Sequence, residues 1–367
     1  MTVSRNGWRS SRQLRAAAVL VIASLALAGC SSASENAAAG GTGKVGEVEL
    51  VQSVRSLSNS YHANWVAGGK LFTDSIKQKQ VVITDEADSQ KQLSQIKALA
   101  SSGKVYALNV DPNSSSDTEA IVRAVTDAGG YVVTQWNKPD DLNPWDVGDH
   151  WVAHINFDGR VSGKEVSAKL FDAMGGSGGI IAIQGILDNT SAKQRFEGLN
   201  AALKNAPGIK LLDQQTANWS RSEALTVTQT LLAKHGAAVQ GIWAANDEMA
   251  LGALEALKAA GLAGKIPLIG FDAVPQALDE IKSGKSGFIA SVSSDAFWQG
   301  GAALSLAYQA ATGKIKVSDL THEQRAFFGK QTVVTSDNVD KFINTPTLVD
   351  LQADFDNPWA RSQGPIN

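Results

Sequence analysis

Polar and aromatic side chains recur at the points where predicted strands end. In the first half of the chain they are the segment from Leu57 to Trp65, then Asn109, and then Trp136 with Asn137. In the second half they are the segment from Gln184 to Arg195, then Asn218-Trp219, Asn246-Asp247, Phe271-Asp272 and Ser293 to Asp295. Aromatic faces cover the C–H surface of a sugar, while amides and charged groups pair with its hydroxyls. The mixture predicts a site for a polyhydroxylated ligand.

Single members of this set have different expected roles. Trp136 and Trp219 lie in polar segments, where a large exposed ring without a partner is unfavourable, so we expect both to face a ligand. Asp272 stands at the end of a strand and is also expected to bind. Asp247 is placed to cap the helix that follows it, and Trp243 lies within an apolar strand, so we assign these two to the framework.

The elements that must position these side chains alternate along the chain. The stretch from Val239 to Gly261 is the clearest example, since an apolar run to Ala245 predicts a buried strand and apolar residues at helical spacing follow from Glu248. About ten such units, interrupted by an irregular segment between Trp136 and His150, predict an α/β fold of two doubly wound parallel-sheet lobes, Rossmann-like in construction. Ligands of open α/β sheets bind at the carboxyl ends of the strands.

The N-terminal segment has the features of a secretion signal. Residues 1–29 combine four arginines with an apolar run from Ala16 to Ala28 that is too short to span a bilayer. The following Leu27-Ala28-Gly29-Cys30 resembles the lipobox of bacterial lipoproteins, which implies lipidation of Cys30, the one cysteine of the chain. Residues 30–44 are small and polar and predict a flexible tether. An extracytoplasmic protein, lipid-anchored to the cell membrane, is expected.

Composition excludes several other classes. Without residues 1–29 the chain has 29 basic and 36 acidic side chains, a net charge of −7, which argues against a nucleic-acid partner. The five histidines lack metal-binding spacing. The glycines from Gly175 to Gly179 precede a strand, whereas a nucleophile elbow or dinucleotide fingerprint follows one. We therefore predict no metal, no cofactor and no catalytic residues.

Four segments carry a resemblance to a known family. They are Ala245 to Leu254, Gly270-Phe271-Asp272, Gln184-Gly185-Ile186 and Arg195 to Gly198. From about Val45 to Thr335 the chain resembles the ribose-binding-protein-like, type I periplasmic binding proteins of ABC sugar transporters. The resemblance implies two lobes joined by a three-segment hinge near residues 157, 294 and 329, with the ligand held between lobes that close on it.

The resemblance also implies domain boundaries. The N-terminal lobe would comprise residues 45–157 plus 295–329, and the C-terminal lobe residues 158–294 plus 330–335. Residues 336–367 have mixed polarity and several prolines, and we interpret them as an extension that wraps the surface.

Site residues follow from the matched motifs. The resemblance implies that Asn59, Tyr61, His62 and Asn109 face the ligand from the first lobe, and that Trp219, Asn246 and Asp272 face it from the second. Ribose-binding proteins have an Asp-Arg pair where this chain has Trp136-Asn137, an Arg where it has Lys193, and a Gln where it has Ser294. These changes alter polar anchors, so another pentose, a hexose or a linear polyol is as plausible as ribose.

The predicted function is that of a monomeric solute-binding lipoprotein, which captures a monosaccharide or polyol and delivers it to ABC permease subunits. Two alternatives remain open. A receptor for chemotaxis or quorum signalling would use the same fold, and a secreted carbohydrate-active enzyme would need a nucleophile and a base within reach of each other. Repressors of related fold carry an N-terminal DNA-binding unit, where this chain has its signal segment.

Overall fold

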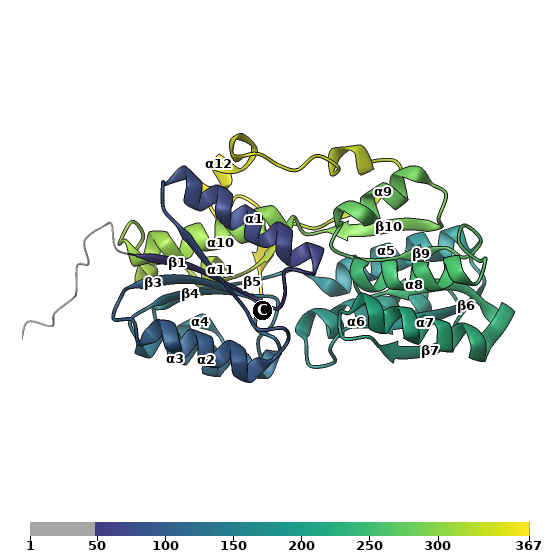
Figure 1. Cartoon of the computed structure of the whole chain (residues 1–367), viewed down its shortest axis with the longest axis horizontal. Helices are drawn as coiled ribbons and strands as arrows, with labels where there is room; N and C mark the ends of the chain where they lie inside the picture. Colours follow the sequence, from purple (N-terminus) through teal and green to yellow (C-terminus); the bar gives the residue numbers. More distant parts are fainter. Residues whose placement is uncertain (1–47, 367) are drawn as a thin grey trace, which may run out of the picture. The chain divides into compact units, whose positions relative to one another are not determined.

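The computed structural model describes residues 48–366, which fold into two α/β lobes (Figure 1). The predicted signal segment, Cys30 and the tether lie outside these residues. The first lobe is built on a sheet of strand order β13-β11-β5-β4-β3-β1-β2, and the second on a sheet of order β12-β10-β9-β8-β6-β7. In each sheet the strands pair in parallel, apart from one antiparallel edge strand, β13 or β12. The predicted fold class is confirmed.

The strands are short and most are buried on both faces, as expected of parallel sheets covered by helices. In the first sheet they are β1 (Glu49–Val54), β2 (Gln80–Thr84), β3 (Tyr106–Val110), β4 (Tyr131–Gln135), β5 (Trp151–Asn156), β11 (Ala326–Gly329) and β13 (Ser362–Pro365). In the second sheet they are β6 (Gly178–Gln184), β7 (Ile209–Thr216), β8 (Val239–Ala244), β9 (Leu268–Ile269), β10 (Phe288–Ser293) and β12 (Thr332–Thr335).

The helices cover both faces of each sheet. Those of the first lobe are α1 (Ser60–Ser75), α2 (Ser89–Ala100), α3 (Thr118–Asp127), α4 (Pro144–Val147), α10 (Ala296–Ala311), α11 (His322–Arg325) and α12 (Leu348–Asp356). Those of the second are α5 (Gly159–Ala173), α6 (Thr190–Lys204), α7 (Arg221–His235), α8 (Asp247–Ala259) and α9 (Pro275–Ser283). The short α4 lies inside the segment for which the sequence predicted an irregular loop.

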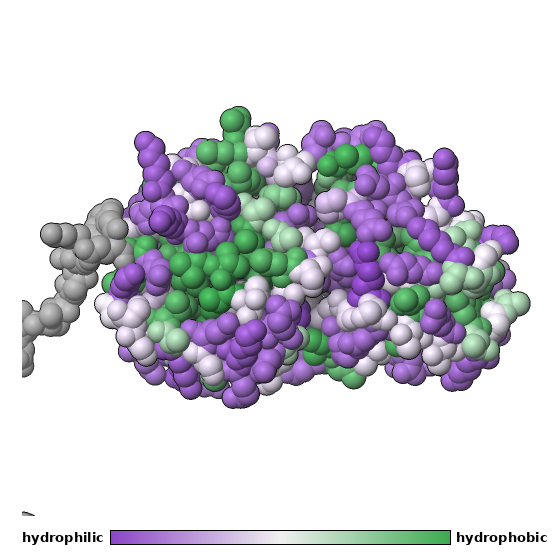
Figure 2. All heavy atoms as spheres, in the orientation of Figure 1, coloured by the Kyte–Doolittle hydropathy of each residue, from purple (hydrophilic) through white to green (hydrophobic). Residues whose placement is uncertain are grey.

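Amphipathic helices leave their polar sides in solvent. Helix α3 buries Ile121, Val122 and Val125 against the sheet, while Glu119 and Arg123 form an exposed ion pair on its other side. Figure 2 shows hydrophilic side chains over most of the visible helices, with an apolar area on the first lobe below α1. Within residues 48–366, no helix has both the length and the apolar character required to cross a membrane.

The chain passes between the two sheets four times within residues 48–366. The passages follow β5, β10, β11 and β12, and the last of them is made by the tail. Helix α12 packs on α1 and α10, where the Phe355 carbonyl accepts hydrogen bonds from Ser305 Oγ at 2.6 Å and Gln309 Nε2 at 3.1 Å. Strand β13 then joins the first sheet beside β11. From Leu348 onward the tail is thus part of the first lobe, in regular elements that the sequence did not predict, whereas its segment Val339–Lys341 packs on α9 of the second lobe.

Helices α1 and α10 approach each other closely because glycines line their contact. A Cβ atom added to Gly300 would lie 1.6 Å from the Trp65 carbonyl oxygen, and one added to Gly68 would lie 1.9 Å from the Phe297 oxygen. This contact holds the N-terminal half of α1 beside the first two turns of α10. The first turn of α1 carries Tyr61 and His62, which line the site described below.

We predict that Gly300→Ala destabilises the protein by about 3 kcal/mol, because the added methyl group must force the two helices apart. Gly313→Ala is the control, since Gly313 has a φ of +71° but no atom within 4 Å of the added Cβ, so that only a backbone cost of about 1 kcal/mol remains. Urea unfolding measures both free energies. Equal losses for the two variants would contradict the close-contact explanation.

Candidate functional site

The carboxyl ends of strands from both sheets meet around one small cavity. Its lining residues come from the segments after β1, β3, β4, β6, β7, β8 and β9. They are Arg55, Asn59, Tyr61, His62, Asp111, Trp136, Asn137, Asn189, Ser191, Arg195, Trp219, Asn246 and Asp272. The sequence predicted eight of these thirteen residues as ligand contacts. Polar and aromatic side chains of both lobes therefore line this cavity.

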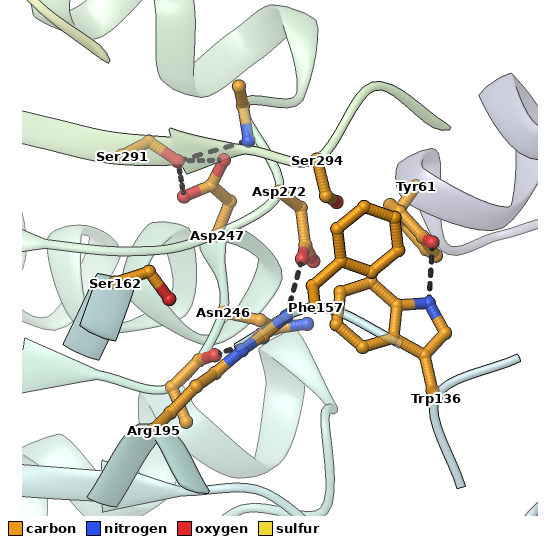
Figure 3. Close-up of polar contacts among 12 residues, drawn as sticks. Tyr61, Trp136, Phe157, Ser162, Arg195, Asn246, Asp247, Asp272, Ser291 and Ser294 are labelled. Carbon is orange, nitrogen blue, oxygen red and sulfur yellow. Dashed lines mark hydrogen bonds and ion pairs between the residues drawn. The ribbon is translucent and has the colours of Figure 1, made fainter. Parts of the chain in front are cut away.

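A buried arginine occupies the centre of the site (Figure 3). The guanidinium carbon of Arg195 lies 5.0 Å from the ring centre of Trp136, 5.8 Å from that of Trp219 and 4.6 Å from that of Phe271. Its Nη1 donates a 2.6 Å hydrogen bond to the Ala245 carbonyl, and its Nη2 lies 3.5 Å from the Asp272 carboxylate. Burial lowers the pKa of Arg195, and the Asp272 charge acts in the opposite direction.

On the first lobe, one pair and one group of three side chains are fixed by hydrogen bonds. Trp136 Nε1 donates to the Tyr61 hydroxyl at 2.7 Å. His62 Nε2 lies 3.1 Å from Asp111 Oδ2, and Asn137 Nδ2 donates to Asp111 Oδ1 at 3.1 Å. Burial lowers the pKa of His62, against the opposing effect of Asp111, so a neutral imidazole is favoured. Asp111 thus orients both of its neighbours.

On the second lobe, Trp219 and Asn246 are held by short contacts. Trp219 Nε1 donates to Asn189 Oδ1 at 2.6 Å, which orients the ring at the cavity. Asn246 is the N-cap of α8, and its Oδ1 accepts from Met249 N at 2.9 Å. That bond leaves the amide nitrogen of Asn246 directed toward the site, where it favours the ionised form of Asp272.

The assignment of Asp247 as a helix cap is wrong. Asn246 caps the helix instead, and Asp247 is buried behind the site, where it accepts hydrogen bonds from Ser291 Oγ at 2.7 Å and from Val274 N at 2.9 Å. Asp247 therefore fixes the segment that follows Asp272. Trp243 is fully buried in the core, as predicted.

Three site residues have backbone conformations that favour glycine. The φ angles are +62° at Trp136, +66° at Trp219 and +109° at Asp272. Such conformations cost of order 1–3 kcal/mol each and persist where the surrounding structure imposes them. Each of these residues lies in the segment that follows a strand, and its side chain lines the cavity. Three residues that line the cavity thus carry backbone strain.

Three other predicted contacts lie away from the cavity. Lys193 is exposed on α6, 3.5 Å from Asp188, whereas Arg195 on the same helix occupies the site. Asn109 is buried below the site and donates to the Gly300 carbonyl at 3.3 Å. Ser294 is buried at the second passage between the lobes and accepts from Gln299 Nε2 at 3.0 Å.

Five lining residues were not among the predicted contacts. They are Arg55, Asp111, Asn189, Ser191 and Arg195. Each lies within two residues of a strand end, or at the N-cap or in the first two turns of the following helix. Arg195 was quoted only as part of a matched motif, so the sequence contained the signal but not the direction of the side chain.

The arrangement is suited to binding. Aromatic rings and charged side chains surround the cavity, and within residues 48–366 the His62 Nδ1, Asn137 Oδ1 and Arg195 Nε atoms are buried without a protein hydrogen-bond partner. Both acceptors and donors are thus available to a ligand. Residues 48–366 contain no group of three or more His, Cys, Asp or Glu side chains that could hold a metal ion.

Comparisons with known proteins identify the family. The periplasmic binding protein domain matches residues 51–315. The ribose import binding protein of Haemophilus influenzae is 32% identical over 236 residues, which cover 64% of this chain and 77% of that protein. A xylitol-binding protein of Mycolicibacterium smegmatis is 36% identical over 131 residues, covering 36% of this chain and 37% of that protein.

A solved structure extends the similarity over both lobes. The twin-arginine translocation pathway signal protein from Burkholderia phytofirmans is 43% identical, with a TM-score of 0.83, and the match covers 87% of this chain and 98% of that one. The chain belongs to the type I periplasmic binding proteins of ABC sugar transporters.

We predict that the Asp272 carboxyl makes stability depend on pH. Burial, more than any other cause, raises its pKa from 3.8 to about 7, with a further increase from Glu248 and a partial offset from Arg195. The folded protein therefore binds a proton that the unfolded chain has released between about pH 4 and 7. This contribution to stability is complete at low pH and is lost as the pH rises through 7.

Urea unfolding between pH 4.5 and 8 tests this sign. Asp272→Asn should show a smaller loss of stability with rising pH than the unmodified protein. Asp340→Asn, which changes a carboxylate with a side chain 79% exposed, should retain the original slope. An Asp272→Asn profile parallel to that of the unmodified protein would show that Asp272 titrates normally.

Proposed function

We propose that the protein is an extracytoplasmic solute-binding lipoprotein of an ABC importer, which captures a monosaccharide or polyol between its lobes and delivers it to a permease. The observation that carries this proposal is the Arg195 guanidinium, buried among Trp136, Trp219 and Asp272 where both lobes meet. Aromatic rings bind the C–H faces of a sugar, and the charged groups bind its hydroxyls.

The relatives support this class of ligand. One is a ribose import binding protein and another is a xylitol-binding protein, so both a cyclic pentose and a linear pentitol are represented. In this proposal the ligand contacts are Asn59, Tyr61, His62, Trp136, Asn137, Trp219, Asn246 and Asp272, with Arg195 and Asp111 added. Lys193, Asn109 and Ser294 act outside the ligand's reach.

Capture requires the cavity to enlarge. The cavity between them has a volume of about 40 Å³, whereas sites for small ligands usually have about 300–1,000 Å³. A sugar can reach Arg195 only when the lobes separate or the lining side chains shift. We propose hinge motion at the passages near 157, 294 and 329, with residues 45–157 plus 295–329 moving against residues 158–294 plus 330–335, and with the fourth passage, after β12, following that motion.

A thermal-shift screen tests the ligand class. We expect at least one compound among pentoses, hexoses and linear polyols to raise the melting temperature, because a ligand at 100 times its Kd stabilises the native state by about 2.7 kcal/mol. Trp219→Ala should weaken that binding by about tenfold or more, as expected for an aromatic residue at the centre of a site.

Trp145→Ala is the matched control for that variant. Trp145 stacks on His322 at a ring distance of 3.8 Å, outside the cavity, so its loss should leave affinity unchanged. The proposal is wrong if no sugar or polyol shifts the melting temperature while another class of metabolite does.

The lipid anchor is tested separately, since Cys30 lies outside the described residues. We expect the full-length protein, expressed in a bacterium that processes lipoproteins, to incorporate radiolabelled palmitate and to sediment with membranes. Cys30→Ser should incorporate no label and appear in the soluble fraction. Equal labelling and sedimentation of the two proteins would exclude anchoring through this cysteine.

A further inference from the structure

Trp136 and Tyr61 form the wall of the cavity on the first lobe. The hydrogen bonds of this wall continue beyond the cavity. Trp136 Nε1 donates to the Tyr61 hydroxyl at 2.7 Å, and that hydroxyl donates to Gln299 Oε1 at 2.6 Å. Gln299 Nε2 in turn donates to the Ser294 carbonyl and to Ser294 Oγ, both at 3.0 Å. A continuous series of buried hydrogen bonds thus joins the wall to the second passage between the lobes.

Gln299 is the central member of this series. It is fully buried in the first turn of α10, immediately after the passage that contains Ser294. Its backbone carbonyl accepts hydrogen bonds from Gln135 Nε2 at 3.1 Å and from Asn109 Nδ2 at 3.4 Å, which come from the two central strands β4 and β3. The backbone of Gln299 is thus held by the sheet. Its side-chain amide is held at the oxygen by Tyr61 and at the nitrogen by Ser294, so the orientation of the side chain is determined.

The direction of each bond in the series is determined as well. Burial raises the pKa of Tyr61 well above its usual range, so the hydroxyl keeps its proton and donates it to Gln299 in a hydrogen bond. The indole N–H of Trp136 donates to the Tyr61 oxygen. Both donors of the wall are consumed, and a ligand meets the aromatic rings together with one remaining lone pair on the Tyr61 oxygen.

Trp136 also packs beside residues at the first and third passages between the lobes. The Trp136 ring lies 4.7 Å from that of Phe157, which stands at the first passage (Figure 3). A Cβ added to Gly329, at the third passage, would lie 2.6 Å from Phe157 Cε1. A displacement of Trp136 would therefore disturb the packing of Phe157 and Gly329 at these two passages.

We propose that Gln299 is a positioning residue for ligand capture, which holds Tyr61 and Trp136 in their binding orientation and connects that wall to the passage at Ser294. Gln299 does not contact the ligand itself. The expected effect of Gln299 on ligand affinity rests on the proposed function. The expected effect of Gln299 on Trp136 does not, because it can be observed in the protein without ligand.

The ligand-free protein provides the first test. The Trp136 indole resonance is observed in protein labelled with ¹⁵N-indole tryptophan and is assigned with Trp136→Phe. In Gln299→Leu the Tyr61 hydroxyl loses its acceptor, so the indole N–H should exchange with solvent about tenfold faster. Ser294→Ala is the control, because Gln299 still donates to the backbone carbonyl, and its exchange rate should match that of the unmodified protein.

Affinity provides the second test, with D-ribose and xylitol as probes in calorimetry. For whichever binds, Gln299→Leu should weaken binding by about 3- to 10-fold, and Tyr61→Phe by a similar factor, since both variants lose the hydrogen bond between the Tyr61 hydroxyl and Gln299. If Gln299 acts through the Tyr61 hydroxyl, the double variant should bind no more weakly than Tyr61→Phe alone.

The outcomes separate the two proposals. Unchanged exchange of the Trp136 N–H in Gln299→Leu overturns the positioning role, as do multiplicative losses of affinity in the double variant. Gln299→Glu retains the acceptor for Tyr61 and should preserve the slow exchange even if Gln299→Leu folds poorly. Absence of binding by the unmodified protein to either probe counts against the sugar or polyol assignment and leaves the exchange result decisive for Gln299.

Discussion

The site depends on keeping one guanidinium charge buried between the two lobes. Removing an ion from water costs several kcal/mol, and a buried charge left without a partner is strongly destabilising. Arg195 offsets this cost through the Ala245 carbonyl, the Asp272 carboxylate and the faces of three aromatic rings. Trp136 belongs to the first lobe and the other partners to the second. Interactions with a single residue therefore favour apposition of the lobes.

Much of the fold could be predicted because its signals are local. Apolar runs and helical spacing place most strands and helices, and the alternation of the two dictates parallel sheets. The location of the site follows from the same pattern, since the carboxyl ends of parallel strands share one edge of the sheet. Trp136, Trp219 and Asp272 were identified in this way, from residue type and strand ends alone.

The direction of individual side chains could not be predicted so readily. Two positions along a helix differ by about 200° around its axis. Lys193, which was predicted as a ligand contact, therefore lies on the solvent face of α6, whereas Arg195, two positions later, lines the cavity. Asn246 and Asp247 differ by one position, and only the backbone angles decide which of them caps α8. The tail is harder still, because α12 is stable through its contacts with α1 and α10, which lie far away in the sequence.

The tail changes how movement of the lobes can be observed. Because β13 adds to the same sheet as β1, the first and last described strands both belong to the first lobe. Fluorophores attached at the two ends of residues 48–366 would travel together, and energy transfer between them would be nearly insensitive to closure. A reporter of closure needs one dye on the second lobe, for example on the exposed helix α7. An immobilised first lobe would leave the second free to turn.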